Sequence, residues 1–577
     1  MSQLKIQEPG SSLTRNETLS LVAVLLGTLF TFASTFTFGW VYDDPPQITQ
    51  NQNLQWGRLG YLFTHHLWAA AMGPEGRFYR PLLTLWFLLN KTLFGLNPHW
   101  FHVTTVLAHV SAAALAFLLA RRLIKDTRAA LFTAAIFGLH PLQVESASWI
   151  SSVNDSLAAA LCFSSFLIYR KAKTLQESSG PWWALSGILF LLALLTKEVS
   201  VVLPAIILVD LWTDSSGEQR SVPSARSWVA PITVYALVGA LWLSLRSWVL
   251  GYAAATSSFV PWSTNLLSAP KILLFNLLRT VLPIGLSPHY HLRLIESPKD
   301  VQFLLNFLLL VALVSFAVIA GKRNRQLWVA FAWLILPLLP SLNLRWMNED
   351  DFVHDRYMYM SMLGVALLAG SAFAWMKKRW PELLLIRPLA VAIVVILAFA
   401  SAIQSQYWAN DLILFARAVN KAPQNEWAQL NYGSALSTRG KYQEAAPHFV
   451  RSYELKPGWR AAEFAGFAFQ QSGDLVQAEQ WFRAALQLDP ALATAWFGLA
   501  QVRLLQHQPE DAILYLRKAL ELQPDADGYH YTLGTALEQI SRRTAAIEEY
   551  QTELQLHPYQ SGARKALDRL QGGQTDR

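Results

Sequence analysis

Repeated apolar runs between Leu19 and Trp408 constrain this chain more than any other feature of its sequence. The first run, Leu19 to Trp40, is long enough for one helix to cross a bilayer. Only 15% of the 577 residues are charged, whereas soluble domains carry about a quarter. The 23 tryptophans suit membrane interfaces, where an indole ring meets both lipid and water. The sequence therefore predicts an all-α membrane bundle with soluble mass attached.

Clusters of lysine and arginine orient the predicted helices. These clusters are RRLIKDTR (Arg121 to Arg128), RKAK (Arg170 to Lys173), Arg220 with Arg226, GKRNR (Gly321 to Arg325) and KKRW (Lys377 to Trp380). Basic residues collect in cytoplasmic loops, and all five clusters are cytoplasmic if about eleven helices cross with the amino terminus inside and the carboxyl terminus outside. In that count the segment Leu266 to Leu286 stays at the outer surface or re-enters. A twelve-crossing alternative places GKRNR outside.

On this topology the predicted outer loops hold most of the polar side chains. Their sequences are VYDDPPQ after Trp40, HPLQVESASWISSVND (His140 to Asp155), TKEVS (Thr196 to Ser200), SPHYHLRL (Ser287 to Leu294) and RWMNEDDFVHDRYMY (Arg345 to Tyr359). The predicted cytoplasmic loops hold little besides basic residues. We therefore expect any chemistry on the outer side.

The chain changes character at Pro423. Prolines recur at 423, 457, 490, 524 and 558, with spacings of 34, 33, 34 and 34, and a period of 34 is typical of tetratricopeptide repeats, which are pairs of antiparallel helices. Small residues share this period: Gly433, Gly466, Ala500 and Gly534 in the first helices, and Ala445, Ala478, Ala512 and Ala546 in the second. Such an α-solenoid offers a concave surface for peptides or partner helices.

The repeats also set the predicted domain boundaries. We expect a membrane domain over residues 1–409, with a first outer loop over 41–80, and a repeat domain over 410–577. The repeat domain divides into four repeats over about 424–557 and a closing helix over 558–571.

Three groups of charged residues in the outer loops have both a chemical and a simple explanation. Asp43 and Asp44 resist joint ionisation because they are adjacent, yet a solvated loop that ends a helix explains them equally well. Glu198 beside Lys197 would form an interfacial ion pair. Arg356 stands where an apolar helix begins, so its guanidinium suits a lipid phosphate, or it extends to the interface.

Several stretches, together with the repeats, resemble the transmembrane and tetratricopeptide-repeat O-mannosyltransferases, the TMTC-like branch of the GT-C glycosyltransferases. The stretches are VYDDPPQI, FYRPLLTL (Phe78 to Leu85), GLNPHWFHVTTVLAHV (Gly95 to Val110), FGLHPLQVESASWISSVNDSLA (Phe137 to Ala158), LLTKEVSVVLP (Leu194 to Pro204), GLSPHY (Gly285 to Tyr290) and HDRYMYMSMLG (His354 to Gly364). The chain departs from the family pattern where His289 replaces an Asp or similar group, and where Val153, Asn154 and Asp155 replace Arg-Ala-Asp. The resemblance covers almost the whole chain and implies a polytopic GT-C helical bundle.

The resemblance implies an inverting transferase that moves a sugar, mannose or another hexose, from a polyprenyl-phosphate carrier to a Ser or Thr hydroxyl of a protein. Asp43 or Asp44 would be the general base. Arg356, Lys197 and Arg80 would bind the donor phosphate. Supporting roles would fall to Glu198, His140, His289, Tyr357 and Tyr359. No cofactor or metal is expected, because Cys162 is the sole cysteine and the histidines at 289 and 291 lack a third ligand.

Two further functions compete with this interpretation. The same donor chemistry could act on a glycan or lipid acceptor, or the membrane part could merely anchor a repeat scaffold. The formal charge of +8 is explained by cytoplasmic loops, so no nucleic-acid partner is expected. We expect membrane lipids, the lipid-linked donor and a protein acceptor in the repeat groove as partners. The predicted location is a bacterial inner membrane with periplasmic repeats, or the endoplasmic reticulum with luminal repeats in a eukaryote.

Overall fold

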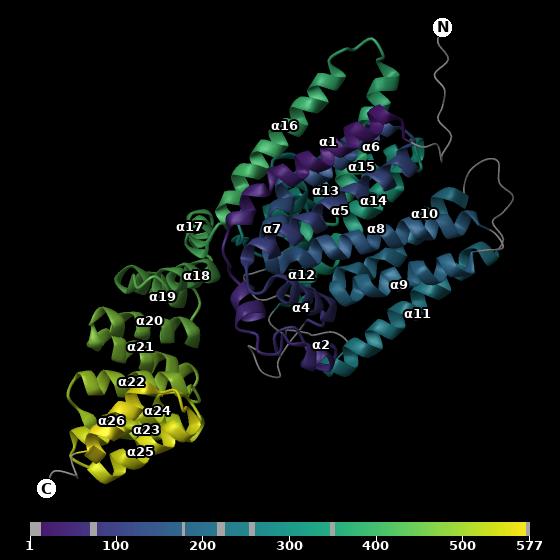
Figure 1. Ribbon diagram of the computed structural model, residues 1–577. Coiled ribbons are helices and arrows are strands. Elements are labelled where there is room, and N and C mark those ends of the chain that lie inside the picture. The colour runs from purple at the N-terminus through teal and green to yellow at the C-terminus, as the bar shows by residue number, and fades with distance from the viewer. Residues whose placement is uncertain are drawn as a thin grey trace. The chain divides into compact units, whose positions relative to one another are not determined.

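The computed structural model describes residues 13–69, 78–175, 179–215, 225–252, 260–346 and 352–572. The regular elements in these ranges are helices, and no strand occurs among them (Figure 1). The chain divides into two compact units, residues 1–414 and 415–577. Residues 70–77 and 347–351 of the predicted outer loops, and Arg220, lie outside the described ranges.

The first unit contains six helical stretches that are long and apolar enough to cross a membrane. They are Arg15–Thr37, Pro98–Ile124, Ile150–Thr174, Trp228–Leu250, Val301–Arg323 and Ile386–Trp408. Shorter apolar helices are Pro81–Phe94, Thr127–Leu139, Gly180–Thr196 and Leu327–Leu342. The count of about eleven crossings stays a prediction, because several crossings would be made by these shorter helices.

The α-helices of this unit follow one another with short connections. They are α1 (Arg15–Thr31), α2 (Leu59–Thr64), α4 (Pro81–Phe94), α5 (Pro98–Ile124), α6 (Thr127–Leu139), α7 (Val144–Ser148), α8 (Val153–Thr174), α9 (Gly180–Thr196), α10 (Leu203–Ser215), α11 (Ala225–Leu250), α12 (Trp262–Val281), α13 (Val301–Arg323), α14 (Leu327–Ile335), α15 (Met362–Arg379) and α16 (Ile386–Ser405). A further helix, α17 (Asp411–Lys421), begins just before the end of the unit.

Aromatic side chains from distant helices fill the centre of the bundle. The ring of Phe163 on α8 contacts that of Phe137 on α6 at 5.7 Å between centroids and that of Trp333 on α14 at 5.2 Å. Neighbouring helices approach closely where residues are small, since a Cβ at Gly364 on α15 would collide with the backbone of α14 at Leu334. Close backbone approach at small residues is typical of helix packing in membranes.

The helix α12 covers the segment for which the sequence predicts no crossing, and it is not one of the six long apolar stretches. It has exposed apolar residues such as Leu278 and yet buries the polar side chains of Asn276 and Arg279. A buried guanidinium requires partners, and these belong to the candidate site described below.

The second unit is a set of antiparallel helix pairs (Figure 1). The pairs are α18 (Glu426–Ser437) with α19 (Tyr442–Leu455), α20 (Trp459–Ser472) with α21 (Leu475–Leu488), α22 (Ala493–Leu505) with α23 (Pro509–Leu522), and α24 (Tyr529–Gln539) with α25 (Arg543–Leu556), followed by α26 (Ser561–Gly572). The periodic residues Ala445, Ala478, Ala512 and Ala546 are all fully buried. The predicted fold class, a helical membrane bundle followed by a tetratricopeptide solenoid, is confirmed.

Candidate active site

Four ion pairs gather where the predicted outer loops meet the bundle. They are Arg356 with Glu145, Lys197 with Asp155, Arg80 with Glu198, and Arg279 with Asp355. The pairs are close enough to interact, because the charges of Arg80 and Arg356 act on Lys197, and that of Glu145 acts on Asp355. All three predicted phosphate-binding cations therefore belong to one cluster, and each already has a carboxylate partner.

Asp44 is completely buried in the loop that follows the first membrane helix. Its Oδ2 accepts a hydrogen bond from the Val41 N–H at 3.0 Å, and its Oδ1 accepts from the N–H and O–H of Ser151 at 2.9 and 2.6 Å. Burial raises the pKa of Asp44 to about 7, although these hydrogen bonds oppose the rise. The carboxylate of Asp44 is thus occupied in joining this loop to the Ser151 loop.

The neighbouring carboxylate, Asp43, is only partly buried. The ring of Tyr42, just before it, stacks on Trp149 with 5.2 Å between the centroids. The guanidinium of Arg356 lies 5.1 Å from the centroid of the same Trp149 ring. Trp149 therefore brings the aspartate pair and Arg356 into one place, although they are more than three hundred residues apart in the sequence.

Glu145 on α7 fixes Arg356 in two ways. Its Oε1 accepts from Arg356 Nη1 at 2.5 Å and its Oε2 accepts from the Arg356 backbone N–H at 3.0 Å. Burial lowers the pKa of Arg356, but the negative charge of Glu145 outweighs this, and the net pKa is raised. Since a guanidinium has five N–H donors in a planar fork, Arg356 keeps donors for a second anion.

Lys197 and Glu198 are adjacent in the sequence but have different partners. Lys197 is buried and donates from Nζ to Asp155 Oδ1. Glu198 instead accepts from Arg80, with 2.8 Å between Nη2 and Oε2. The alternative explanation that Lys197 and Glu198 pair with each other is therefore wrong. Burial lowers the pKa of Lys197, while the charge of Asp155 opposes that shift.

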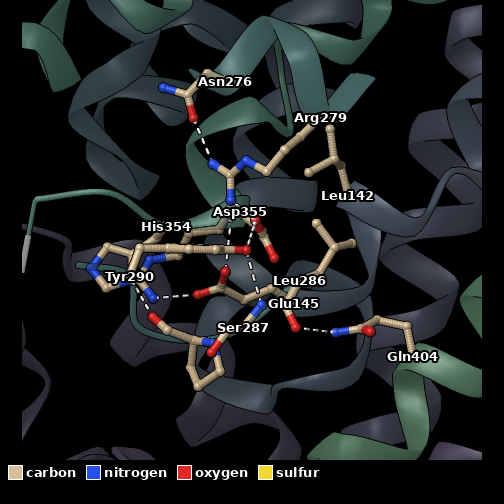
Figure 2. A network of polar contacts seen from close by, with 12 residues as sticks. Leu142, Glu145, Asn276, Arg279, Leu286, Ser287, Tyr290, His354, Asp355 and Gln404 are labelled. Atoms are coloured by element: carbon tan, nitrogen blue, oxygen red, sulfur yellow. Dashed lines mark hydrogen bonds and ion pairs between the residues drawn. The ribbon is translucent and has the colours of Figure 1, made fainter. Parts of the chain in front are cut away.

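Arg279 from α12 lies at the centre of a second polar network (Figure 2). It donates to Asp355 Oδ1 and, at 2.8 Å, to Asn276 Oδ1. The Tyr290 O–H donates to the same Asp355 oxygen at 2.8 Å, and the guanidinium lies 4.4 Å from the centroid of the Tyr290 ring. Asp355 directly precedes Arg356, so this network fixes one side of the Arg356 turn.

The predicted supporting residues hold loops together. His140 accepts from the Leu142 N–H and donates from Nε2 to the Thr280 carbonyl at 3.1 Å. Burial lowers its pKa to about 4, so His140 is neutral at pH 7. His289 is buried against the rings of Tyr42 and His354.

Two predicted tyrosines separate at this point. Tyr357 lies beside the Arg356 guanidinium, at 5.6 Å from its ring centroid. Tyr359 is fully buried and its O–H donates to His109 Nδ1 at 2.7 Å. Tyr359 therefore packs within the helical core, where its contact supports α5 and not the ion pairs.

Sequence reasoning missed Glu145, Arg279, Ser151 and Tyr290 as site residues. One signal was available for the first two: a charged residue beside apolar runs needs a partner when it is buried. The identity of each partner could not be read from the sequence, because Glu145 and Arg356 are separated by 211 positions.

The geometry defines a class: a helical membrane protein with a conserved-charge type of loop site, built from paired acids and bases, and a tetratricopeptide solenoid. The family "Dolichyl-phosphate-mannose-protein mannosyltransferase" matches residues 79–248, which include Arg80, Glu145, Asp155 and the pair at 197–198. Tetratricopeptide repeat families match residues 430–493 and 469–537.

Curated relatives extend the similarity over most of the chain. Human "Protein O-mannosyl-transferase TMTC1" is 25% identical over 72% of this chain and 52% of its own length. Mouse TMTC3 is 23% identical over 90% of this chain and 62% of its own length, and human TMTC4 is 25% identical over 72% and 64%. The chain thus spans about half to two thirds of the length of these relatives. The predicted resemblance to the transmembrane and tetratricopeptide-repeat O-mannosyltransferases is confirmed.

Proposed function

We propose that this protein is an inverting glycosyltransferase that moves mannose or another hexose from a polyprenyl-phosphate carrier to a Ser or Thr hydroxyl of a protein. The transfer takes place on the non-cytoplasmic face of the membrane, and the repeats recruit the acceptor. The names of the relatives, which are protein O-mannosyl-transferases, support the reaction class.

One observation carries the proposal: the Asp43–Asp44 turn and Arg356 share the ring of Trp149. A group-transfer site of this kind needs a carboxylate for the acceptor proton and a cation for the departing phosphate. Asp44 has three internal hydrogen bonds and no exposed surface. Asp43 is the more accessible of the two, so we assign it as the base and Asp44 as the residue that holds the turn.

The reaction follows from these assignments. The acceptor oxygen forms a bond to the anomeric carbon as its proton passes to Asp43. The bond from the anomeric carbon to the phosphate oxygen breaks, and the electron pair leaves with the polyprenyl phosphate. Negative charge grows on that phosphate, and Arg356, with Lys197 and Arg80 nearby, stabilises it. Attack from the face opposite the leaving group inverts the anomeric centre.

Buried polar atoms around the ion pairs also favour a polar ligand. Side-chain atoms without a hydrogen-bond partner among the described residues belong to Ser146, Ser148, Asn154, Glu198, Arg279 and Ser287. Buried polar atoms are nearly always hydrogen-bonded. A cluster of unbonded ones is expected where a sugar phosphate or ordered water binds.

A long apolar cavity supports a lipid-linked donor. It has a volume of about 920 Å³ and lies among α10, α12, α13 and α14. Phe275 and Thr280 of α12 line it, and the same Phe275 packs on the Arg279 guanidinium at 4.2 Å. The cavity therefore adjoins the ion-pair cluster, and its apolar wall suits an isoprenoid chain whose phosphate lies in the cluster.

The test uses purified full-length protein with mannosyl-phosphate carriers of long and of short isoprenoid chain and with a Ser/Thr-rich protein. We expect a mass increase of one hexose on the protein. Ala317→Trp, which fills the cavity, should impair use of the long-chain donor and spare the short-chain donor. Leu308→Trp, on the same helix but outside the cavity lining, is the matched control. Absence of hexose transfer from either donor would refute the proposal.

A further inference from the structure

The backbone of Tyr42 has an unusual conformation. Its φ is 56°, in the left-handed region, which a residue with a bulky side chain rarely adopts. Such a conformation persists only when surrounding contacts impose it, and it is found most often at functional sites. The contacts that impose it on Tyr42 are therefore informative.

The left-handed residue forms part of a tight turn that orients Asp44. The Asp44 N–H donates to the Val41 carbonyl at 3.0 Å, which closes a four-residue turn with Tyr42 and Asp43 at its centre. The Val41 N–H returns a hydrogen bond to the Asp44 carboxylate. If Tyr42 relaxed to an ordinary φ, this turn would open, and both aspartates would change direction.

Residues that follow the last membrane helix hold Tyr42 in place. The Tyr42 N–H donates to Asp411 Oδ1 at 2.7 Å, across 369 positions of sequence. Asp411 is the first residue of α17. Close by in the sequence, Trp408 stacks on Trp149 at 5.5 Å between centroids, and Trp149 stacks on Tyr42. A short carboxylate hydrogen bond and a column of three rings thus fix one residue.

We infer that Asp411 is a positioning residue of the transfer site. Its carboxylate holds Tyr42 in the left-handed conformation and so fixes Asp43 and Asp44 relative to Arg356, which contacts the same ring column through Trp149. Asp411 touches no reacting atom in this scheme. The kinetic part of the inference rests on the proposed function, whereas the structural part does not.

The structural part is tested by hydrogen–deuterium exchange of the full-length protein. The Asp44 amide is the diagnostic reporter, because it bonds to Val41 and not to Asp411. In Asp411→Ala we expect this amide to exchange roughly tenfold faster or more, since a charge-assisted hydrogen bond that holds the turn is lost. Asp411→Asn keeps an acceptor oxygen and should restore most of the protection. Lys421→Ala, an exposed change on the same helix, is the matched control.

The kinetic part compares the same three variants in sugar transfer. Asp411→Ala should lower kcat by roughly tenfold to a hundredfold with little change in the KM for the donor, because the base is displaced while the phosphate site remains. In a Tyr42→Gly background, where glycine adopts a positive φ without strain, Asp411→Ala should have a smaller further effect.

The possible outcomes are distinct. Unchanged exchange at Asp44 in Asp411→Ala would overturn the inferred contact. Faster exchange with an unchanged kcat would overturn the positioning role. If the wild-type protein transferred no sugar, the proposed function would fail, while the exchange experiment would still decide whether Asp411 holds the turn.

Discussion

Charged residues behave differently in the two units of this protein. In the repeats, ion pairs join residues three or four positions apart on one helix, such as Lys518 with Glu521, whose side chains are 50% and 64% exposed. In the membrane unit, the pair Arg279 with Asp355 spans 76 positions and each side chain is only 6% exposed. Exposed pairs contribute little to stability, whereas buried pairs are retained at a desolvation cost. The difference indicates that the buried pairs serve a site.

Removal of one partner from a buried pair should have the largest effect on stability. Arg279→Met leaves the Asp355 carboxylate buried without its cation, and we expect a loss of about 3–5 kcal/mol. The double variant Arg279→Met/Asp355→Asn should recover much of this loss. Lys518→Met in the repeats should cost less than about 1 kcal/mol. Thermal unfolding in detergent measures all three, and equal losses for Arg279→Met and Lys518→Met would contradict the comparison.

Loss of Arg356 should have the largest effect on donor use. Arg356→Ala should lower kcat/KM for the donor by roughly 10²–10³-fold, as removal of a donor to a developing oxyanion does. Arg356→Lys keeps the charge but loses the planar fork, so its activity should lie between those of Arg356→Ala and the wild type. Steady-state kinetics at varied donor concentration measures this. Wild-type donor kinetics in Arg356→Ala would show that this side chain merely extends to the interface.

Overpacking of the repeats should affect stability alone. Ala478 is fully buried between helices, and Ala478→Trp should destabilise the second unit by roughly 1–3 kcal/mol. Because each repeat packs on the next, unfolding of the repeats should shift, while affinity for the lipid-linked donor stays the same. A weaker donor affinity in Ala478→Trp would show that the two units are not independent in this respect.

The smallest expected effect is on pH dependence. Burial raises the pKa of Asp44 to about 7, and its ionised carboxylate accepts the hydrogen bonds that hold the turn. Below that pH the carboxyl is protonated, so transfer should fall as pH decreases through about 7 and level off above it. Asp44→Asn should remove this limb from the pH profile and lower the plateau. A profile that keeps the same limb in Asp44→Asn would assign the titration to another group.

The sequence predicted the repeat unit more completely than the site. A period of 34 residues places Ala445, Ala478, Ala512 and Ala546 in the core, because each repeat makes the same local contacts. The ion pairs depend instead on contacts between distant helices. Adjacent Lys197 and Glu198 suggest a mutual pair, yet the fold directs them to Asp155 and Arg80.

Exposure of the two aspartates also required the structure. Asp43 and Asp44 have the same chemistry and adjacent positions, so the sequence does not distinguish them. The left-handed conformation of Tyr42 turns one carboxylate into the protein and leaves the other partly exposed. This conformation depends on Asp411, which no local pattern around Tyr42 indicates.

The central claim is that Asp43 accepts the proton in transfer of a lipid-linked sugar. The most direct measurement is the transfer rate and the donor affinity of Asp43→Asn, with Glu382→Gln, an exposed carboxylate of the same unit, as control. A general base contributes typically 10²–10⁴-fold, so the account predicts a decrease of about that size in Asp43→Asn, unchanged donor affinity and a normal rate in Glu382→Gln. A wild-type transfer rate in Asp43→Asn would contradict the account.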